Sequence, residues 1–351
     1  MAWKKLNEYV DFWDKPVLGT EKQEDKKRFM ALCIDEDSKN PYLGIARKIT
    51  KRQGNPDVPG FIDKSKLVIV KSEDLLSWKV VSDLNIEGVD ELIEKLGTDK
   101  NYFIGLEDPD IWTGEAGKKH VYFTIAYKKK NERGYDLYLG HAFGESLGSL
   151  KASDPVLSRV DDKITGFKEI CPVPSLGGGK RIVLAETFVF HGIDKEYSAI
   201  SVIKVGDLSL RWEYVRLVHD PKYEDREWCK GHSSPCRIFN PEFLSCRLQN
   251  KEYLVGVMNG REPNQIIKGK EIYKKFRPGL FLFDPASESI VWIADEPLLE
   301  DPIASTITFA SEVVYLNDTE AILYAHPNDS FVRAYKLNSS KLRELLPDRI
   351  D

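Results

Sequence analysis

Residues 107–112 read EDPDIW, and after a turn residues 121–127 read VYFTIAY, a run typical of a β-strand. A related string, NPEFL, occupies residues 240–244, so that Pro241 corresponds to Pro109. Strings that recur at a fixed spacing indicate a fold built from repeated units. These strings therefore help to distinguish one all-β architecture from another.

A second, unrelated marker repeats at nearly the same spacing. Trp78, in the string DLLSW, returns as Trp212, in the string DLSLRW, after almost the same length of chain that separates the two prolines. Weaker anchors mark single units, because Pro172 lies near the middle of the interval between the prolines and Ser311 follows Pro241 by a similar step. The repeating unit is about one-fifth of the chain, a spacing that suits the blades of a β-propeller.

Short runs rich in β-branched and aromatic residues are bounded by turn-forming residues throughout the chain. They predict strands near residues 66–70, 121–127, 182–184, 254–258, 280–283, 290–293 and 321–325. Helical patterns are confined to residues 89–96 and 340–346. We therefore predict an all-β protein, a single five-bladed β-propeller over residues 1–351, with a β-sandwich as the alternative.

The composition supports a globular fold and argues against some partners. Apolar residues make up 42% of the 351 residues and charged residues 30%. A net charge of −5 without a concentrated basic segment argues against nucleic acid and anionic membranes. No run of about 18 apolar residues and no signal-peptide pattern occur, so we expect a cytoplasmic protein, with homo-oligomerisation left open.

The cysteines favour reduced thiols, because there are five of them, scattered through a long chain. Cys229, His232, Cys236 and Cys246 lie close in sequence and have side chains that zinc can bind. Their spacing does not match a paired CxxC site. We therefore favour buried thiols for the cysteines and a pocket-lining position for His232, and we predict no metal and no cofactor.

Acidic residues recur near the anchors of the repeat. In a propeller the innermost strands line an axial cavity, so that acids at equivalent positions of different blades converge. The acids concerned are Glu107, Asp108, Asp110, Glu169, Glu242 and Glu312. Cleavage of a glycosidic bond needs two carboxyl groups whose pKa values are separated, and a shared pocket raises the pKa of one of them.

With these motifs the chain resembles the propeller glycosidases of glycoside hydrolase families 32, 43, 62, 68 and 130. It is most similar to family 130, the β-mannoside phosphorylases and hydrolases. Three features carry this resemblance. They are EDPDIW followed by VYFTIAY, the segment GHSSP at residues 231–235, and the C-terminal segment over residues 279–337. The motifs occur in the same order and span most of the chain.

The resemblance implies roles for two acids. Asp108 matches the catalytic aspartate that protonates the glycosidic oxygen, although an Asp-Pro pair can also be a simple turn at a strand start. Glu169 matches the glutamate of the third blade, the general acid of families 32 and 43, although it could equally be a solvated charge. Together they imply an enzyme that cleaves a short, mannoside-like glycoside.

The departures from the family concern phosphate. Where family 130 phosphorylases have basic residues, this chain has Asp110 and Glu186, and a carboxylate repels phosphate. Asp110 or Glu186 could instead be the general base of an inverting hydrolase, or merely a surface or salt-bridged acid. The residues Lys230, His232, Arg237 and Arg261 could still form an anion site, which leaves a phosphorylase open.

The remaining candidates are predicted to bind substrate. They are Glu107, Trp112, Tyr127, His232, Arg237, Glu312 and Tyr324. We expect most of the aromatic residues, including Trp78 and Trp212, to pack within the core instead. Insertions at residues 50–64 and 263–276 are predicted to rim the mouth of the pocket. A carbohydrate-binding propeller without catalytic activity is the remaining alternative.

Overall fold

The computed structural model describes residues 2–22, 27–39, 41–114, 117–130, 134–174, 181–191 and 196–350. Strands dominate these residues, and the α-helices that they contain are α1 (Val89–Leu96) and α2 (Ser339–Arg343). The predicted all-β class is therefore confirmed, and both helices lie where the sequence pattern placed them. None of the helices in the described residues is long and apolar enough to cross a membrane.

Two sheets are antiparallel and run nearly in chain order. The first contains four strands, β13 (Ile164–Pro172), β14 (Arg181–Phe190), β15 (Glu196–Val205) and β16 (Glu213–His219). The second follows the order β17 (His232–Ile238), β19 (Lys251–Arg261), β22 (Phe276–Asp284) and β23 (Ser289–Ile293), with β18 (Ser245–Leu248) beside β19. A separate hairpin joins β20 (Gln265–Ile267) to β21 (Lys270–Ile272).

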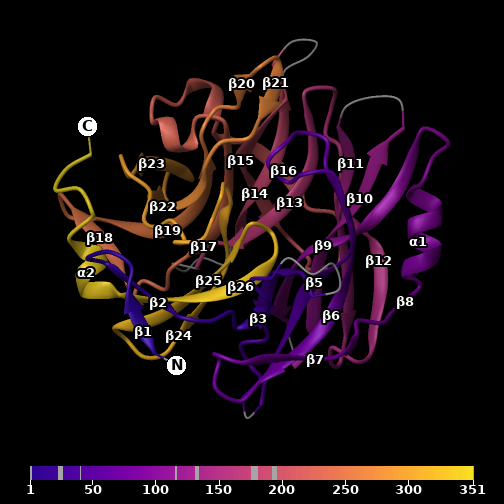
Figure 1. Ribbon diagram of the computed structural model, residues 1–351, viewed down its shortest axis with the longest axis horizontal. Helices are drawn as coiled ribbons and strands as arrows, with labels where there is room; N and C mark the ends of the chain where they lie inside the picture. Colours follow the sequence, from indigo (N-terminus) through magenta and orange to yellow (C-terminus); the bar gives the residue numbers. More distant parts are fainter. Residues whose placement is uncertain are drawn as a thin grey trace.

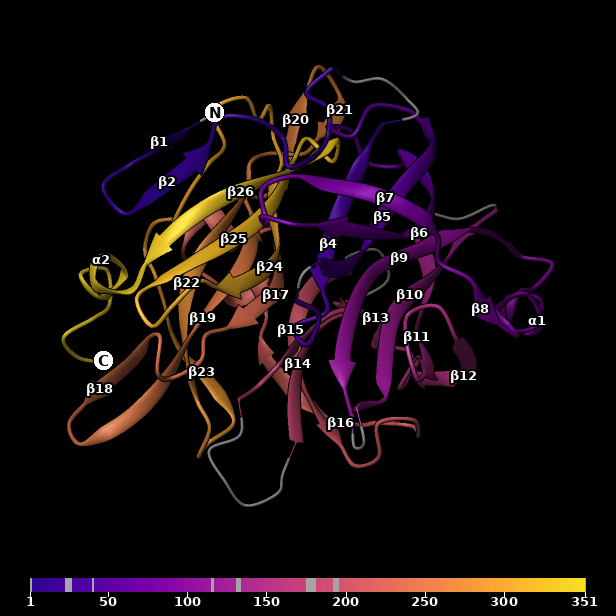
Figure 2. The ribbon, with the colours of Figure 1, turned by 90° about the horizontal axis from the view of Figure 1, so that it is seen from below.

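The third sheet combines both ends of the chain. The strands from the C-terminal end are β24 (Thr308–Tyr315), β25 (Glu320–Pro327) and β26 (Phe331–Asn338). The strands from the N-terminal end are β1 (Trp3–Lys5), β2 (Val10–Trp13) and β3 (Leu18–Gly19). Because β2 and β3 both pair with β26, the two ends of the chain are joined by hydrogen bonds (Figure 2).

The largest sheet consists of two antiparallel parts joined by one parallel pair, Ser65 with Gly105. One part contains β4 (Phe29–Ile34), β5 (Tyr42–Gln53), β6 (Ile62–Ser72) and β7 (Trp78–Asp83). The other contains β9 (Asn101–Thr113), β10 (Lys119–Lys129), β11 (Tyr135–Gly144) and β12 (Leu150–Leu157), with β8 (Ile86–Glu87) at its edge. A β-carbon on Gly105 would meet the backbone oxygen of Ser65 at 2.6 Å, so this close approach requires glycine.

The first strands of these antiparallel groups form a closed circuit of contacts. Strand β4 contacts β9, β9 contacts β13, β13 contacts β17, β17 contacts β24, and β24 returns to β4. Figure 1 shows β9, β13 and β17 of this circuit near the middle of the molecule. Side chains on these strands can therefore meet although they are far apart in sequence.

The apolar core lies between neighbouring sheets. One cluster packs β5 and β6 against β25 and β26, and contains Trp78 and Tyr324 in edge-to-face contact at 6.5 Å. Another packs the β9–β12 group against the β13–β16 sheet, where Trp112 stacks on Trp212 at 5.5 Å. The prediction that Trp78 and Trp212 are packing residues is confirmed, and the cysteines are buried free thiols.

A β-bulge recurs at the same place in each strand of the central circuit. An extra residue on one strand of a pair bends that strand and re-aims its side chains. The register shifts fall at Ala31-Leu32, Asp108-Pro109, Glu169, Cys236 and Ser311. Ala31, Asp108 and Glu169 also share a left-handed backbone, with φ of 47°, 48° and 46°. The internal repeat thus extends to a local backbone distortion.

Candidate active site

A cavity of about 210 Å³ lies at one end of the central strands. The charged side chains that line it include Arg47, Asp108, Lys168, Glu169, His232 and Arg261. Pro56, Phe61, Tyr273 and Phe276 line it as well, so the two predicted insertions do reach this mouth. The volume falls below the range of roughly 300–1,000 Å³ that is usual for drug-sized ligands, which fits a small ligand.

Asp108 and Glu169 occupy equivalent bulges on the adjacent strands β9 and β13, and both line the cavity. Burial raises the pKa of Glu169 well above its ordinary value, and the neighbouring Asp108 carboxylate raises it further. A left-handed backbone at two non-glycine residues is strained, and such strain is concentrated at functional sites. The sequence prediction brought these two residues together, and the structure does the same.

Two cations lie beside the Asp108 carboxylate. Arg47 Nη1 lies 3.3 Å from Oδ1, and Lys168 Nζ lies 3.9 Å from Oδ2. Oδ2 is buried and has no hydrogen-bond partner among the described residues. Asp108 lines the cavity, so the unpaired oxygen leaves a hydrogen-bonding position that a ligand can use.

Glu107 holds Arg47 in place beside Asp108. It forms an ion pair with Arg47, the cation that also contacts Asp108. Burial raises the pKa of Glu107 to about 7, Arg47 opposes that rise, and the Asp108 charge adds to it. Because Glu107 does not line the cavity, its expected contact with substrate is replaced by a role in positioning Arg47.

Glu186 lies behind Lys168 and is fully buried. Its Oε2 atom lies 3.6 Å from Lys168 Nζ and 3.4 Å from His232 Nε2. Burial acts to raise its pKa, but Lys168 and His232 outweigh burial and lower the pKa to about 2. Unlike Asp108, Glu186 does not line the cavity, so it does not reach a water molecule bound there. The expectation that Glu186 is the general base is therefore corrected: it orients Lys168 and His232.

Asp110 is bound by Arg237 and lines a different cavity from Asp108. Arg237 Nη1 and Nη2 donate to Asp110 at 2.9 and 2.8 Å, and Nε and Nη2 donate to Glu312 at 2.7 and 3.0 Å. All three residues line a second cavity of about 450 Å³ and none lines the first. The expectation that Asp110 is a base for Asp108 is corrected, because both of its oxygens already accept from arginine.

Two of the three aromatic candidates lie in the core, and the third borders the second cavity. Tyr127 is 2% exposed and donates to the Ile93 carbonyl, and Tyr324 is fully buried and donates to the Leu75 carbonyl at 2.7 Å. Trp112 lines the second cavity and stacks on Trp212. Their expected contact with a ligand in the Asp108 cavity is corrected, because burial and packing keep all three rings out of it.

Arg47 and Lys168 were missed from the sequence, although Lys168 directly precedes Glu169. Of the cations expected to bind an anion, His232 and Arg261 do line the cavity, whereas Arg237 lines the second cavity. Arg261 stacks on Tyr273, 4.4 Å from the ring centroid. Among the described residues no carboxylate forms an ion pair with it, and burial lowers its pKa.

Comparison with solved structures gives the same fold for proteins that act on sugars. The β-1,2-mannobiose phosphorylase from Listeria innocua superposes with a TM-score of 0.65 at 11% identity, covering 96% of this chain and 99% of that one. The fold is that of the propeller glycosidases. The resemblance to family 130 inferred from the motifs is thus confirmed at the level of structure.

Two further structures extend this similarity. One comes from the family 130 mannoside phosphorylases, described as containing hydrolases that target β-1,2 mannosidic linkages in Candida mannan; its TM-score is 0.64 at 15% identity, covering 100% and 99% of the two chains. The other is a Leishmania mexicana mannose phosphorylase with phosphate, with a TM-score of 0.53 at 14% identity, covering 98% and 92%. No protein-family model and no curated protein matches the sequence.

Proposed function

We propose that this protein cleaves a glycosidic bond of a short, mannoside-like carbohydrate in the cavity that Asp108 and Glu169 line. One observation carries the proposal: two carboxyl groups lie on equivalent bulges of adjacent strands, with cations beside one and a raised pKa on the other. Glycosidic cleavage needs such a division, because one group gives a proton while the other stays negative.

Glu169 is the proton donor in this scheme. Its raised pKa keeps the proton on the carboxyl group, so that it can pass to the leaving oxygen. Asp108, beside Arg47 and Lys168, is the negative partner that activates water or stabilises positive charge on the sugar. This reverses the role of Asp108 that the family resemblance implies.

The product anomer depends on how far apart the two carboxyl groups lie. Inverting enzymes leave roughly 6.5–9.5 Å between them for a water molecule. The inversion expected from the sequence stays a prediction, and the anomer of the first product tests it. The proposal therefore specifies cleavage of the glycosidic bond and not the anomer of the product.

Phosphorolysis is the second candidate, and Arg261 favours it. Its guanidinium lines the cavity without an ion-pair partner among the described residues, and Lys168 and Arg47 lie on the same cavity. Arg261 Nη1 and Nη2 donate to Asn264 and to the Gly231 carbonyl, whereas its buried Nε has no hydrogen-bond partner in the part of the chain that the structure describes and can donate to a phosphate oxygen. The structural neighbours include phosphorylases as well as hydrolases.

We further propose that the antiparallel groups are five blades of one propeller. The recurring bulge and the closed circuit of first strands support this count, and so does the packing of apolar clusters between neighbouring groups. The parallel pair between Ser65 and Gly105 then joins two blades side by side. A ring of this kind brings the carboxylates of separate blades to one axis.

The test is a screen of aryl glycosides and manno-oligosaccharides, with and without inorganic phosphate. Hydrolysis releases free sugar in both buffers, whereas phosphorolysis yields a sugar 1-phosphate only when phosphate is present. Proton NMR of the first product gives its anomer. If no glycoside is cleaved but calorimetry detects sugar binding that Asp108→Asn weakens, the protein is a carbohydrate-binding propeller and the enzymatic proposal fails.

A further inference from the structure

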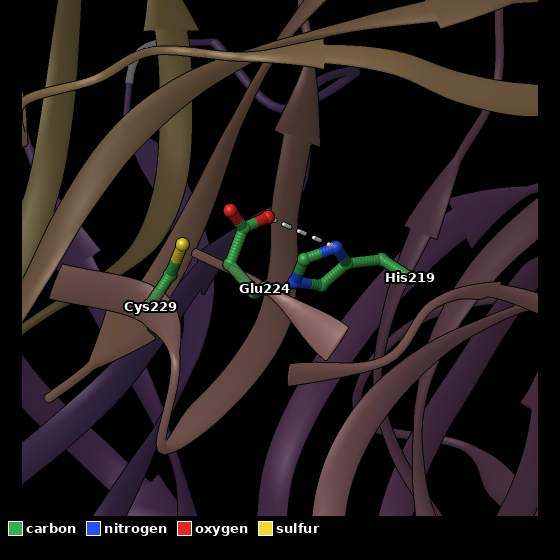
Figure 3. A group of neighbouring side chains, drawn as sticks. All are labelled: His219, Glu224 and Cys229. Atoms are coloured by element: carbon green, nitrogen blue, oxygen red, sulfur yellow. Dashed lines mark ion pairs between the residues drawn. The ribbon is translucent and has the colours of Figure 1, made fainter. Parts of the chain in front are cut away.

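Three different metal-binding side chains meet in the connection between β16 and β17. His219 ends β16, Glu224 follows the short 3-10 helix η2 (Pro221–Tyr223), and Cys229 ends the next one, η3 (Glu227–Cys229). All three are buried, and one donor atom of each lies within 4.8 Å of the others. In Figure 3 the Glu224 carboxylate lies between the Cys229 side chain and the His219 ring, and the dashed line joins it to His219.

Hydrogen bonds fix which ring nitrogen of His219 carries the proton. Ser233 Oγ donates to the Cys229 carbonyl at 3.1 Å, so it accepts from His219 Nε2, which lies 2.9 Å away. The proton of the neutral ring is therefore on Nε2, and the lone pair of Nδ1 faces Glu224. Orientation of a histidine by a hydrogen bond on its far nitrogen is typical of metal sites.

The atoms that face one another have no proton between them. His219 Nδ1 lies 3.8 Å from Glu224 Oε2, which is too long for a hydrogen bond. With the ring proton on Nε2, the lone pair of Nδ1 faces a carboxylate oxygen, an arrangement that a cation between them would stabilise.

The existing partners of Glu224 leave this oxygen open. The backbone amides of Asp225 and Arg226 and the Arg226 guanidinium all donate to Oε1, and none donates to Oε2. The Arg226 charge is shared with Asp295, whose Oδ1 lies 3.2 Å from Nε. Arg226 is therefore balanced by two carboxylates and does not exclude a cation from the far side of Glu224.

We propose that His219 Nδ1, a carboxylate oxygen of Glu224 and Cys229 Sγ bind one zinc ion. Imidazole, carboxylate and thiolate are the three zinc ligand types of proteins. At bond lengths of about 2.0–2.3 Å, tetrahedral ligand atoms lie about 3.3–3.8 Å apart. The three donor atoms lie within 4.8 Å of one another, so side-chain movements of about 1 Å would bring them to these distances. A fourth position faces the adjoining cavity of about 610 Å³, which His219 and Glu224 line.

Charge and proton balance agree with a dication. Zinc binding displaces the proton of the Cys229 thiol to solvent and ends its contact with the Arg226 carbonyl. One thiolate and one carboxylate then neutralise the two charges of the ion.

The ion would stabilise the connection between β16 and β17, which joins two sheets next to the candidate active site. Cys229 is three residues before His232, which lines the Asp108 cavity, and Ser233 links His219 to the same strand. We therefore assign the ion a structural role. This inference does not depend on the proposed glycosidase activity, because no residue of the cluster lines that cavity.

The test replaces zinc with cobalt in the full-length protein. One equivalent of Co²⁺ should give visible d–d absorption of a tetrahedral ion and a thiolate-to-cobalt charge-transfer band in the near ultraviolet. Cys229→Ser should remove the charge-transfer band, whereas Cys246→Ser, at another buried thiol, should leave it unchanged. Elemental analysis after dialysis against Zn²⁺ should give one ion per chain, and the Tm should rise with bound zinc.

Two results would overturn the inference. One is the absence of a thiolate band in the unsubstituted protein, a measurement that does not depend on whether any variant folds. The other is a band that survives in Cys229→Ser, which would place the metal elsewhere. His219→Gln, which keeps a polar side chain, should weaken Co²⁺ binding by about 10–100-fold or more if the ring nitrogen is a ligand.

Discussion

Arg237 binds the Asp110 carboxylate through both of its terminal nitrogens, at 2.9 and 2.8 Å. The same guanidinium donates to Glu312 and to the carbonyl of Ile170, so one side chain on β17 connects β9, β13 and β24. Two-bond contacts between arginine and carboxylate are among the stronger hydrogen-bonded pairs in proteins. Arg237 therefore links four of the central strands to one another through hydrogen bonds and ion pairs.

Arg237→Gln should lower the free energy of unfolding by about 3–5 kcal/mol, because two buried carboxylates lose their cation. Urea denaturation measures this difference. Arg159→Gln is the matched control, since Arg159 and its partner Asp162 are exposed and such pairs contribute little. Equal stability of the two variants would show that the ion pairs of Arg237 do not stabilise the fold.

Tyr324→Phe tests whether the Tyr324 ring packs in the core and does not bind substrate. Removing the hydroxyl takes away one of two donors to the Leu75 carbonyl, because Trp78 Nε1 still donates to it at 3.2 Å, and should cost about 0.5–1.5 kcal/mol of stability. The KM for any substrate should not change, because the ring lies in the core. A raised KM at unchanged stability would return Tyr324 to the binding site.

Glu186 should make stability depend on pH in a defined direction. Its pKa in the folded protein, about 2, lies below its ordinary value of 4.5, so its stabilising effect is present above pH 4.5 and is lost as the pH falls toward 2. Glu186→Gln should therefore be less stable than the native protein at pH 7, by a margin that shrinks below pH 4.5. Glu87→Gln, at an exposed glutamate, should show no such trend.

Glu169→Gln should separate substrates by their leaving groups. A glycoside whose leaving group is a weak base needs little proton transfer, whereas an unactivated disaccharide needs it fully, and general acids contribute about 10²–10⁴-fold. The variant should lose turnover of the disaccharide by about that factor and retain far more on the activated aryl glycoside. Equal losses on both substrates would exclude Glu169 as the proton donor.

The fold was largely predictable from the sequence, because blade repeats leave their spacing in the chain. Pro109 and Pro241, and Trp78 and Trp212, all reported the same period. The convergence of Asp108 and Glu169 followed from that period alone. It required no knowledge of which way either side chain pointed.

The rest of the site could not be predicted, because the spacing of the repeat does not show in which direction each side chain points. Asp108 and Asp110 are two residues apart on one strand, yet they line different cavities. Arg47 comes from β5, a second strand of its group, where no anchor motif marked it. His219, Glu224 and Cys229 meet only because two short 3-10 helices fold the connection back on itself.

The most direct test of the account is glycoside cleavage by Asp108→Asn. Asparagine tolerates the left-handed backbone at this position, with φ of 48°, so the variant should fold. Its kcat should fall by at least about 10²-fold. Glu36→Gln, at an exposed glutamate on the second cavity, should match the native enzyme. Unchanged kcat in a folded Asp108→Asn variant would contradict the claim that this carboxylate takes part in the reaction.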